Sequence, residues 1–262
     1  MKRVFLAAAL VGASASAVIA GGLDRTGLPI GIIFEDGRYL ELSFGGASPS
    51  VSGVGGLVTP GALSGDMTES YFQFGAAYKA DINDNLSYAI ILDQPFGADV
   101  AYPTGTGYFA GGSLAELSTV AATGILKYTS DQNFSIYGGL RAQTLKASAT
   151  VPFVVGYSAS TSSDWAPGYV VGAAYEKPEI ALRVALTYNS AIEHNLATTE
   201  SSASPLGGPN SSTTQITTPQ SINLDLQTGI AEGTLLFGGV RWVDWSDFDI
   251  SPADYIVLTG GT

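Results

Sequence analysis

The strongest constraint in this sequence is a two-residue alternation between apolar and polar side chains. It is clearest in residues 70–82, where one set of positions is apolar and the other mostly polar: Phe72, Phe74, Ala76, Tyr78, Ala80 and Ile82 against Tyr71, Gln73, Gly75, Ala77, Lys79 and Asp81. Successive side chains of a β-strand point to opposite faces of the sheet. The same alternation recurs at 180–188 and 221–228. We therefore expect an all-β fold whose strands carry one apolar and one more polar face.

The alternation predicts about nine strands, near residues 38–48, 70–82, 86–95, 115–128, 134–145, 165–176, 180–192, 220–230 and 234–244. Short turns are expected at 83–85, 129–133, 176–179 and 231–233, and long Gly/Ser/Thr-rich links at 49–69, 96–114, 146–164 and 193–219. Short turns that alternate with long loops are typical of a transmembrane antiparallel β-barrel of the outer membrane. A water-soluble β-sandwich is the alternative, and it would not require this alternation of connections.

The N-terminus has the pattern of an export signal. Lys2 and Arg3 precede an apolar run at 5–11, and small residues lead to Gly21, which predicts a secretory signal peptide over residues 1–20. An unprocessed apolar helix is the alternative. No later segment is long and apolar enough for a transmembrane helix. A membrane-integral mature chain would therefore have to be a closed barrel, located in the outer membrane of a Gram-negative bacterium.

Charge and the titratable residues exclude several function classes. The chain has 11 Lys and Arg against 23 Asp and Glu, so a nucleic-acid partner is not expected. The single histidine, His194, opens a polar link that we expect to be an exposed loop, which argues against catalysis. Asp244, Asp247 and Asp249 fit either a calcium site or a solvated junction between strand and loop, and we favour the junction. We expect no enzyme activity, no metal and no cofactor.

Four stretches of the sequence are similar to a known family. They are 34–37 followed by 39–45, 82–86 running to 94–97, 168–175 with 186–190, and 242–248 with its Trp-Ser-Asp-Phe core. Together they resemble the FadL/TodX/OmpP1 family of outer-membrane long-chain fatty acid and hydrocarbon transporters. The stretches extend over almost the whole mature chain and occur at expected strand ends and turns.

The resemblance implies a fourteen-stranded barrel, a small N-terminal plug, apolar extracellular loops, and a kink in the third strand that opens sideways into the membrane. Residues 21–36 would form a short plug and 37–262 a partial barrel, although the family's Asn-Pro-Ala plug motif is absent. Nine strands is an odd number, and single-chain bacterial barrels use even numbers. The usual aromatic-terminated last strand is also missing. We therefore expect a C-terminally truncated fragment; the alternative is a chain that closes on itself.

Two segments are candidates for a ligand path. Pro95, Phe96 and Gly97 lie where the third strand should end, and they fit either the family's lateral gate or an ordinary strand end. Proline removes a ladder donor, and glycine permits the unusual backbone angles of a bend. The uncharged stretch between Lys146 and Asp164 is expected to expose an apolar patch that binds a ligand, formed by Val151, Phe153, Val155 and Tyr157 with Tyr108 and Phe109 from a neighbouring loop. The alternative is a strand extension packed on other loops.

The alternation also places four basic residues on the lumenal face: Lys79, Lys127, Arg141 and Arg183. Lys79 and Arg141 are possible contacts for a ligand carboxylate, because charge-assisted hydrogen bonds to carboxylates are strong. Pairing with the lumenal acids Glu41, Asp81 or Asp93 is the alternative, and we favour it.

The leading hypothesis is passive outer-membrane transport of hydrophobic small molecules such as long-chain fatty acids or aromatic hydrocarbons. A general porin for polar solutes and a structural or adhesin barrel are the alternatives. A porin should line its constriction with charges and lack a plug. The expected partners are the hydrophobic ligand, outer-membrane lipid and lipopolysaccharide, and the barrel assembly machinery during insertion.

Overall fold

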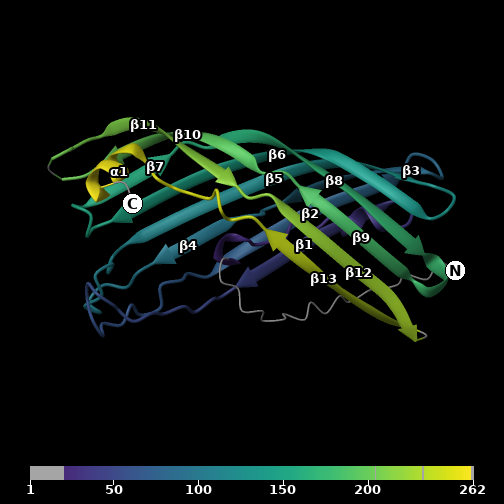
Figure 1. The fold of residues 1–262 in the computed structure, drawn as a ribbon, viewed down its shortest axis with the longest axis horizontal. Coiled ribbons are helices and arrows are strands. Elements are labelled where there is room, and N and C mark those ends of the chain that lie inside the picture. Colours follow the sequence, from purple (N-terminus) through teal and green to yellow (C-terminus); the bar gives the residue numbers. More distant parts are fainter. Residues whose placement is uncertain (1–20, 204, 232, 261–262) are drawn as a thin grey trace.

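The computed structural model describes residues 21–260 except 204 and 232, so the expected signal peptide lies outside the described residues. The chain forms one curled antiparallel sheet (Figure 1), which confirms the all-β barrel-type fold. Nine strands follow one another across the sheet in chain order: β1 (Tyr39–Ala47), β2 (Tyr71–Asp81), β3 (Leu86–Asp93), β5 (Leu114–Thr129), β6 (Phe134–Val151), β8 (Asp164–Lys177), β9 (Leu182–Asn189), β12 (Ser221–Ala231) and β13 (Thr234–Val243). They correspond to the nine strands expected from the sequence.

Four further strands lie in segments that we expected to be irregular links: β4 (Gly97–Ala101), β7 (Tyr157–Thr161), β10 (Ile192–Ser201) and β11 (Asn210–Thr218). β10 pairs with β11 and β7, while β7 also pairs with β6 and β4 pairs with β5. These strands were not predicted, although a strand extension was the alternative for the segment between Lys146 and Asp164 that contains β7. The helical elements are short: η1 (Gly21–Leu23), η2 (Gly31–Phe34), η3 (Pro178–Ile180) and α1 (Ala253–Thr259). Within the described residues, no helix is long and apolar enough to cross a membrane.

The short and long connections lie at opposite ends of the sheet. In Figure 1 the tight turns β2–β3, β8–β9 and β12–β13 are at the right-hand end, while β4, the β10–β11 hairpin and α1 lie toward the left-hand end. The β2–β3 turn shows why these turns are tight. The Asn83 carboxamide oxygen accepts hydrogen bonds from the backbone N–H groups of Asn85 (3.0 Å) and Leu86 (2.9 Å). An Asx turn of this kind reverses the chain within a few residues.

The half of the sheet next to the short turns, which we call the lower half, has an apolar outer face. On β6 the outward side chains of Phe134, Ile136 and Leu140 are 58%, 65% and 76% exposed, while the inward side chains of Ser135 and Arg141 are buried. The outward residues of β1 and β2 follow the same rule, with Phe44 and Phe72 largely exposed. An outward apolar band of this kind is the surface that lipid covers in outer-membrane barrels.

The other half of the sheet, next to the long connections, is called the upper half. It reverses this polarity. The outward residues of β6, β10 and β11 become polar: Thr144, Lys146, Glu193, Asn195, Thr213 and Gln215. Three inward residues, Leu145, Leu196 and Ile216, are buried and pack together with Phe248. Trp165 lies outward opposite Thr144, at the level where the polarity changes. Tryptophan and tyrosine gather at membrane–water interfaces, so we infer that β10 and β11 lie outside the membrane-spanning band.

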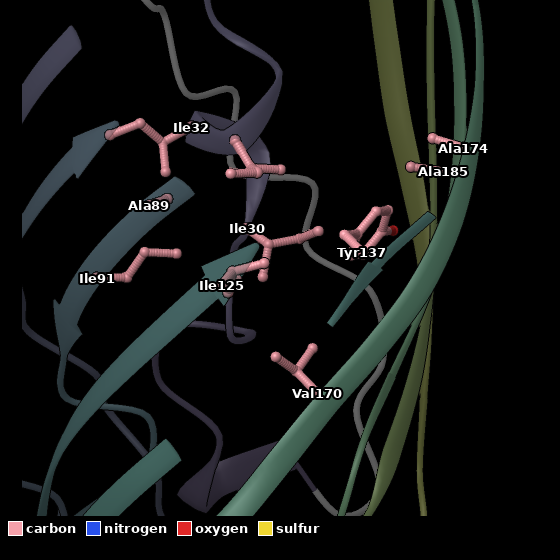
Figure 2. Packing of buried hydrophobic residues seen from close by; sticks show 10 residues of the cluster. Ile30, Ile32, Ala89, Ile91, Ile125, Tyr137, Val170, Ala174 and Ala185 are labelled. Carbon is pink, nitrogen blue, oxygen red and sulfur yellow. The ribbon is translucent and has the colours of Figure 1, made fainter. Parts of the chain in front are cut away.

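The N-terminal segment, residues 21–36, lies on the concave side of the lower half. Figure 2 shows Ile30 and Ile32 between this segment and the strands, close to the labelled side chains of Ile91 and Ile125. These isoleucines and Ile33 are almost completely buried. The ring of Phe34 meets Tyr137 edge to face, with ring centroids 5.6 Å apart. The main apolar core therefore joins the N-terminal segment to the inside of the sheet.

Candidate functional site

The wall of the sheet is interrupted after β3. β3 ends at Asp93, which pairs with Ala121 of β5, and β4 begins at Gly97, which pairs with Ser118 of the same strand. Three residues therefore lie opposite two, which is the signature of a β-bulge. β3 and β4 are two parts of one interrupted strand. The expected site at Pro95, Phe96 and Gly97 lies at this break.

One hydroxyl group replaces the missing ladder at the break. The Phe96 N–H donates to Thr119 Oγ1 (2.8 Å), and Thr119 Oγ1 donates to the Phe96 carbonyl oxygen (2.7 Å). The Phe96 side chain is only 4% exposed, and its ring lies edge to face with Trp245. The chain at the break is thus turned toward the inside of the sheet.

Gly97 leaves room for the Arg25 side chain at the break. A Cβ atom at this position would lie 2.4 Å from Cζ of Arg25, because the guanidinium group packs directly on the glycine. We expected Gly97 to provide an unusual backbone angle, but it is not among the residues with positive φ. That explanation was wrong, and close approach of Arg25 is the physical reason for the glycine.

The upper part of β2 pairs with β1 but has no partner strand on the side that faces the break. β2 pairs with β3 only from Ala76 to Asp81. Within residues 71–75, the Phe74 N–H donates instead to the side-chain oxygen of Gln94 (3.1 Å). A cavity of about 540 Å³ lies here, and its lining includes both inward residues such as Ile91 and outward residues such as Leu92.

The N-terminal segment is fixed to the sheet at both sides of its curve. Arg25 forms an ion pair with Asp99 of β4, and its backbone N–H donates to the Pro95 carbonyl (2.9 Å). At the opposite end of the strand order, the Asp24 carboxylate pairs with Arg241 of β13 (2.7 Å). The segment therefore bridges the broken strand and the last strand of the sheet.

The loops of the upper half bring four aromatic rings together. Tyr102 and Tyr108 are stacked at 5.7 Å, Tyr108 lies 4.7 Å from Phe109, and Phe109 meets Phe153 edge to face at 5.1 Å. Phe153 is 50% exposed, as the sequence suggested. We call Tyr102, Tyr108, Phe109 and Phe153 the loop aromatic cluster. Tyr102 was not predicted as part of it.

The other expected patch residues lie in different environments. Val155 is 44% exposed beside Phe153, and its φ of 51° is unusual for a β-branched residue. Val151 is half-buried at the end of β6. Tyr157 is only 1% exposed, so its expected place on an exposed patch was wrong. The reason is that β7 pairs with two strands and Tyr255 of α1 covers the ring, with centroids 5.2 Å apart.

Val151 and Tyr157 instead line a second cavity, of about 330 Å³, on the inside of the upper half. We call it the upper cavity. Its wall is formed mostly by small and apolar side chains from β4, β5, β6 and β7, together with Ile250 and Tyr255 from the C-terminal segment. Nothing in the local sequence indicated this contribution from residues near 250, because it depends on how the chain returns across the sheet.

The lumenal basic residues face inward as predicted, and each already has a partner. Lys79 is 2% exposed, pairs with Asp81 and donates to the Gly37 carbonyl. Lys127 lies 3.8 Å from Glu176. Arg141 is 5% exposed and donates from Nε to Thr123 (2.9 Å). Arg183 donates to Gln227 and lies over the Phe34 ring. The role of Lys79 and Arg141 as carboxylate contacts stays a prediction.

His194 does not lie in an exposed loop, so that expectation was wrong. It belongs to β10, its side chain is fully buried, and its Nδ1 lies 3.4 Å from Asp164 while Nε2 lies 3.2 Å from the Gln143 amide nitrogen. Burial lowers the pKa of His194, and the Asp164 carboxylate opposes this shift.

The aspartates near the end of β13 interact with neighbouring polar groups. Asp244 accepts hydrogen bonds from the Ser246 hydroxyl (2.6 Å) and from Gln220 (3.1 Å). These hydrogen bonds lower the pKa of Asp244. Among the residues that the structure describes, no group of three or more His, Cys, Asp or Glu residues is arranged to hold a metal ion.

Comparison with known proteins identifies the family. The model of the outer membrane protein transport protein family (OMPP1/FadL/TodX) matches residues 62–253, which is well over half of the chain. The chain belongs to this family. The resemblance found in the sequence is therefore confirmed. No curated protein sequence matches the chain.

Two solved structures of similar fold agree with this assignment. A Pseudomonas aeruginosa FadL homologue has a TM-score of 0.60 at 15% identity, covering 82% of this chain and 61% of the homologue. The Ralstonia pickettii toluene transporter TbuX has a TM-score of 0.57 at 11% identity, covering 81% of this chain and 64% of the transporter. The chain thus spans somewhat less than two thirds of the length of these structures. At this identity the likeness shows the fold.

Proposed function

We propose that this chain forms part of a passive outer-membrane channel for hydrophobic small molecules. Residues 21–36 act as its plug, and ligands leave sideways through the break at 94–96. The observation that carries the proposal is the interrupted strand: pairing with β2 is lost beside the break, while β4 resumes on β5 beyond it. An ordinary strand end would lead into a loop. A bulge keeps the strand in the sheet but bends it, so the wall changes direction locally.

A ligand would contact three surfaces in turn on its way to this break. The loop aromatic cluster offers half-exposed rings at the upper end, and the upper cavity lies inside the same end. The cavity at the break lies lower, between the N-terminal segment and β1–β3. Burial of apolar ligand surface contributes about 25 cal/mol per Å² to the binding free energy. Each of the three surfaces can therefore bind a hydrophobic ligand without an energy source.

The packing of the N-terminal segment favours this function over a general porin. A porin needs a water-filled lumen, whereas Ile30, Ile32 and Ile33 fill the concave side of the lower half. The inward basic residues also form ion pairs with protein carboxylates, such as Lys79 with Asp81 and Lys127 with Glu176. These pairs leave little free charge to attract polar solutes. We therefore place the route for ligands above the plug and through the wall.

The test is to close the break reversibly. The chain has no cysteine, so the pair Phe74→Cys and Gln94→Cys can be joined by a short bifunctional thiol reagent with a reducible linkage. In the full-length protein, we expect uptake of a labelled alkylbenzene to fall when the pair is joined and to recover on reduction. The matched control is Tyr78→Cys with Ile90→Cys, which lie directly opposite each other in the same paired strands and outside the lining of the cavity at the break. Joining them should leave uptake unchanged.

Three outcomes would contradict the proposal in different ways. Full uptake with the 74–94 pair joined would refute sideways exit. Uptake of a labelled sugar by the unmodified protein at the same rate as the alkylbenzene would favour a porin. Failure of the unmodified protein to take up either compound would refute transport and favour a structural or adhesin barrel.

A further inference from the structure

We propose that the upper cavity admits uncharged hydrophobic ligands and rejects carboxylates, so that the substrates are neutral hydrocarbons or similar neutral compounds and fatty acids are excluded. The inference rests on the proposed function and names the substrate class of the same path. It follows from the charges and hydrogen bonds around the cavity, which are set out below.

The volume and the lining of the upper cavity suit a small apolar molecule. Its volume of about 330 Å³ is in the lower part of the range of small-molecule sites. Five alanines, Ala98, Ala115, Ala147, Ala149 and Ala159, contribute to the lining and keep the space open. The rings of Tyr157 and Tyr255 form an aromatic side of the cavity.

Three threonine hydroxyls of the wall already bond to protein groups. The Thr198 and Thr214 hydroxyls lie 2.7 Å apart, and Thr198 Oγ1 lies 3.0 Å from the Leu196 carbonyl oxygen. Thr161 Oγ1 accepts the Ala147 N–H (2.9 Å). The donors that the wall offers to a ligand carboxylate are neutral hydroxyls, and burying a carboxylate without a cationic partner costs free energy.

The fixed charge beside the cavity is negative. Glu116 is the one charged residue among the lining residues that the structure describes, and its side chain is exposed on the outer face of β5. Behind Tyr157, the fully buried Glu200 accepts hydrogen bonds from the Tyr157 hydroxyl (2.8 Å), the Ser212 hydroxyl (2.6 Å) and the Asp254 N–H (3.0 Å). Burial, reinforced by Glu200, raises the pKa of Tyr157, so the phenol keeps its proton and donates to the carboxylate. A ligand carboxylate in the cavity would be repelled by Glu200.

No basic side chain balances this charge within the described part of the chain. That part contains nine of the 11 Lys and Arg residues, all except Lys2 and Arg3, and none of the nine lines the upper cavity. Six face the inside, and each donates to or pairs with a protein group: Arg25, Lys79, Lys127, Arg141, Arg183 and Arg241. The other three, Arg38, Lys146 and Lys177, are exposed.

The experiment compares two ligands that share an apolar body, hexylbenzene and 6-phenylhexanoate, at pH 8. The full-length protein is placed in phospholipid nanodiscs, and binding is corrected for partition into empty nanodiscs. We expect hexylbenzene to bind at least about tenfold more tightly, because an unpaired buried carboxylate costs more than the 1.4 kcal/mol of a tenfold change. Uptake of the two compounds by cells that carry the protein is measured in parallel.

A cation placed in the cavity should change this preference. Ala115→Lys adds an ammonium group to the lining, and Ala115→Met adds a side chain of similar length without charge. We expect Ala115→Lys to bring the two dissociation constants closer together, while Ala115→Met keeps the wild-type ratio. Heat-dependent mobility of each variant on a gel shows whether the barrel has folded. If Ala115→Lys does not fold, the wild-type ligand pair still decides the question.

The outcomes separate the two proposals. If 6-phenylhexanoate binds and is taken up as well as hexylbenzene, transport stands and the inferred substrate class is wrong. If Ala115→Lys folds and the ratio does not change, this cavity does not set the preference. If neither compound is taken up, the proposed function itself fails.

Discussion

The two halves of β6 follow opposite rules. In the lower half, Ile136 and Leu140 point outward and Arg141 inward; in the upper half, Lys146 points outward and Leu145 inward. The strand is continuous across the change, so backbone geometry is not the cause. We infer that the difference is the medium outside the sheet, with lipid beside the lower half and water beside the upper half. A single strand can therefore carry two opposite patterns of apolar and polar side chains.

The reversal also determines what each half can do. In the lower half the inside holds charged and polar groups, and the N-terminal segment covers them with its isoleucines. In the upper half the inside combines the Leu145, Leu196 and Ile216 cluster with buried polar residues such as His194 and Glu200, and part of it is left open as the upper cavity. We propose that the upper half receives the hydrophobic molecule and that the lower half supports the wall through which it leaves.

The largest expected effect is on packing in the upper half. Leu145 is fully buried against Leu196 and Ile216, so Leu145→Ala should lower the free energy of unfolding by about 2–5 kcal/mol. The control, Leu140→Ala on the outer face of the same strand, should lose less because lipid fills the space. Urea unfolding in lipid vesicles measures both. Equal losses would show that the upper interior is not a packed core.

The second effect concerns the medium outside the sheet. Leu140→Arg would put a charge in the apolar band and should cost about 2–4 kcal/mol near the membrane midplane. Gln215→Arg, outward on β11, should change the free energy of unfolding by less than about 0.5 kcal/mol, because the side chain stays in water. A similar cost at both positions would contradict the assignment of the two media.

The third effect is on capture at the loops. Replacing Phe153 and Val155 by Asp together should reduce uptake of a labelled alkylbenzene several-fold, because two charges would disrupt the half-exposed apolar surface. Asp also tolerates the left-handed backbone of Val155 better than valine does, so folding should not suffer. The control places the same two charges on β11, as Ser211→Asp with Thr213→Asp. Equal uptake by the two double variants would exclude the loop aromatic cluster from the path.

The smallest effect is a pH dependence of the β10–β11 hairpin. Because burial lowers the pKa of His194 in the folded state, the unfolded hairpin binds the proton more readily. The stabilisation is therefore complete above the unfolded value of about 6.5 and decreases as pH falls below it. Hydrogen-exchange protection of residues 192–201, corrected for intrinsic rates, should be lower at pH 5.5 than at pH 7.5. His194→Gln should remove this dependence, and an unchanged profile in that variant would assign it to another group.

The same comparison explains what the sequence could predict. The nine main strands were found because lipid-facing positions such as Phe72 and Leu186 contrast strongly with their neighbours. β10 was missed because its inward face mixes Leu196 with Glu200, and its outward face is polar. Its alternation is present, but the contrast in polarity is weak. Water outside the strand removes the signal that lipid provides.

The site was predicted where a residue has a local backbone effect, and missed where partners come from distant segments. Pro95 marked the break because proline cannot donate to the ladder. The contacts that hold the break, from Thr119 and Arg25, depend on strands that meet only in the folded sheet. Tyr157 was placed on the surface because nothing nearby in sequence shows that Tyr255 covers it.

The most direct test of the account is to label the path itself. An uncharged alkylbenzene that carries a diazirine would be photoactivated on the full-length protein in the outer membrane, and the adducts located by mass spectrometry. We expect adducts in residues 147–161 of the upper cavity and loops and in residues 91–97 at the break, reduced by excess hexylbenzene. Adducts confined to lipid-facing residues such as Leu126 and Leu140, with no competition by hexylbenzene, would contradict a path through the protein.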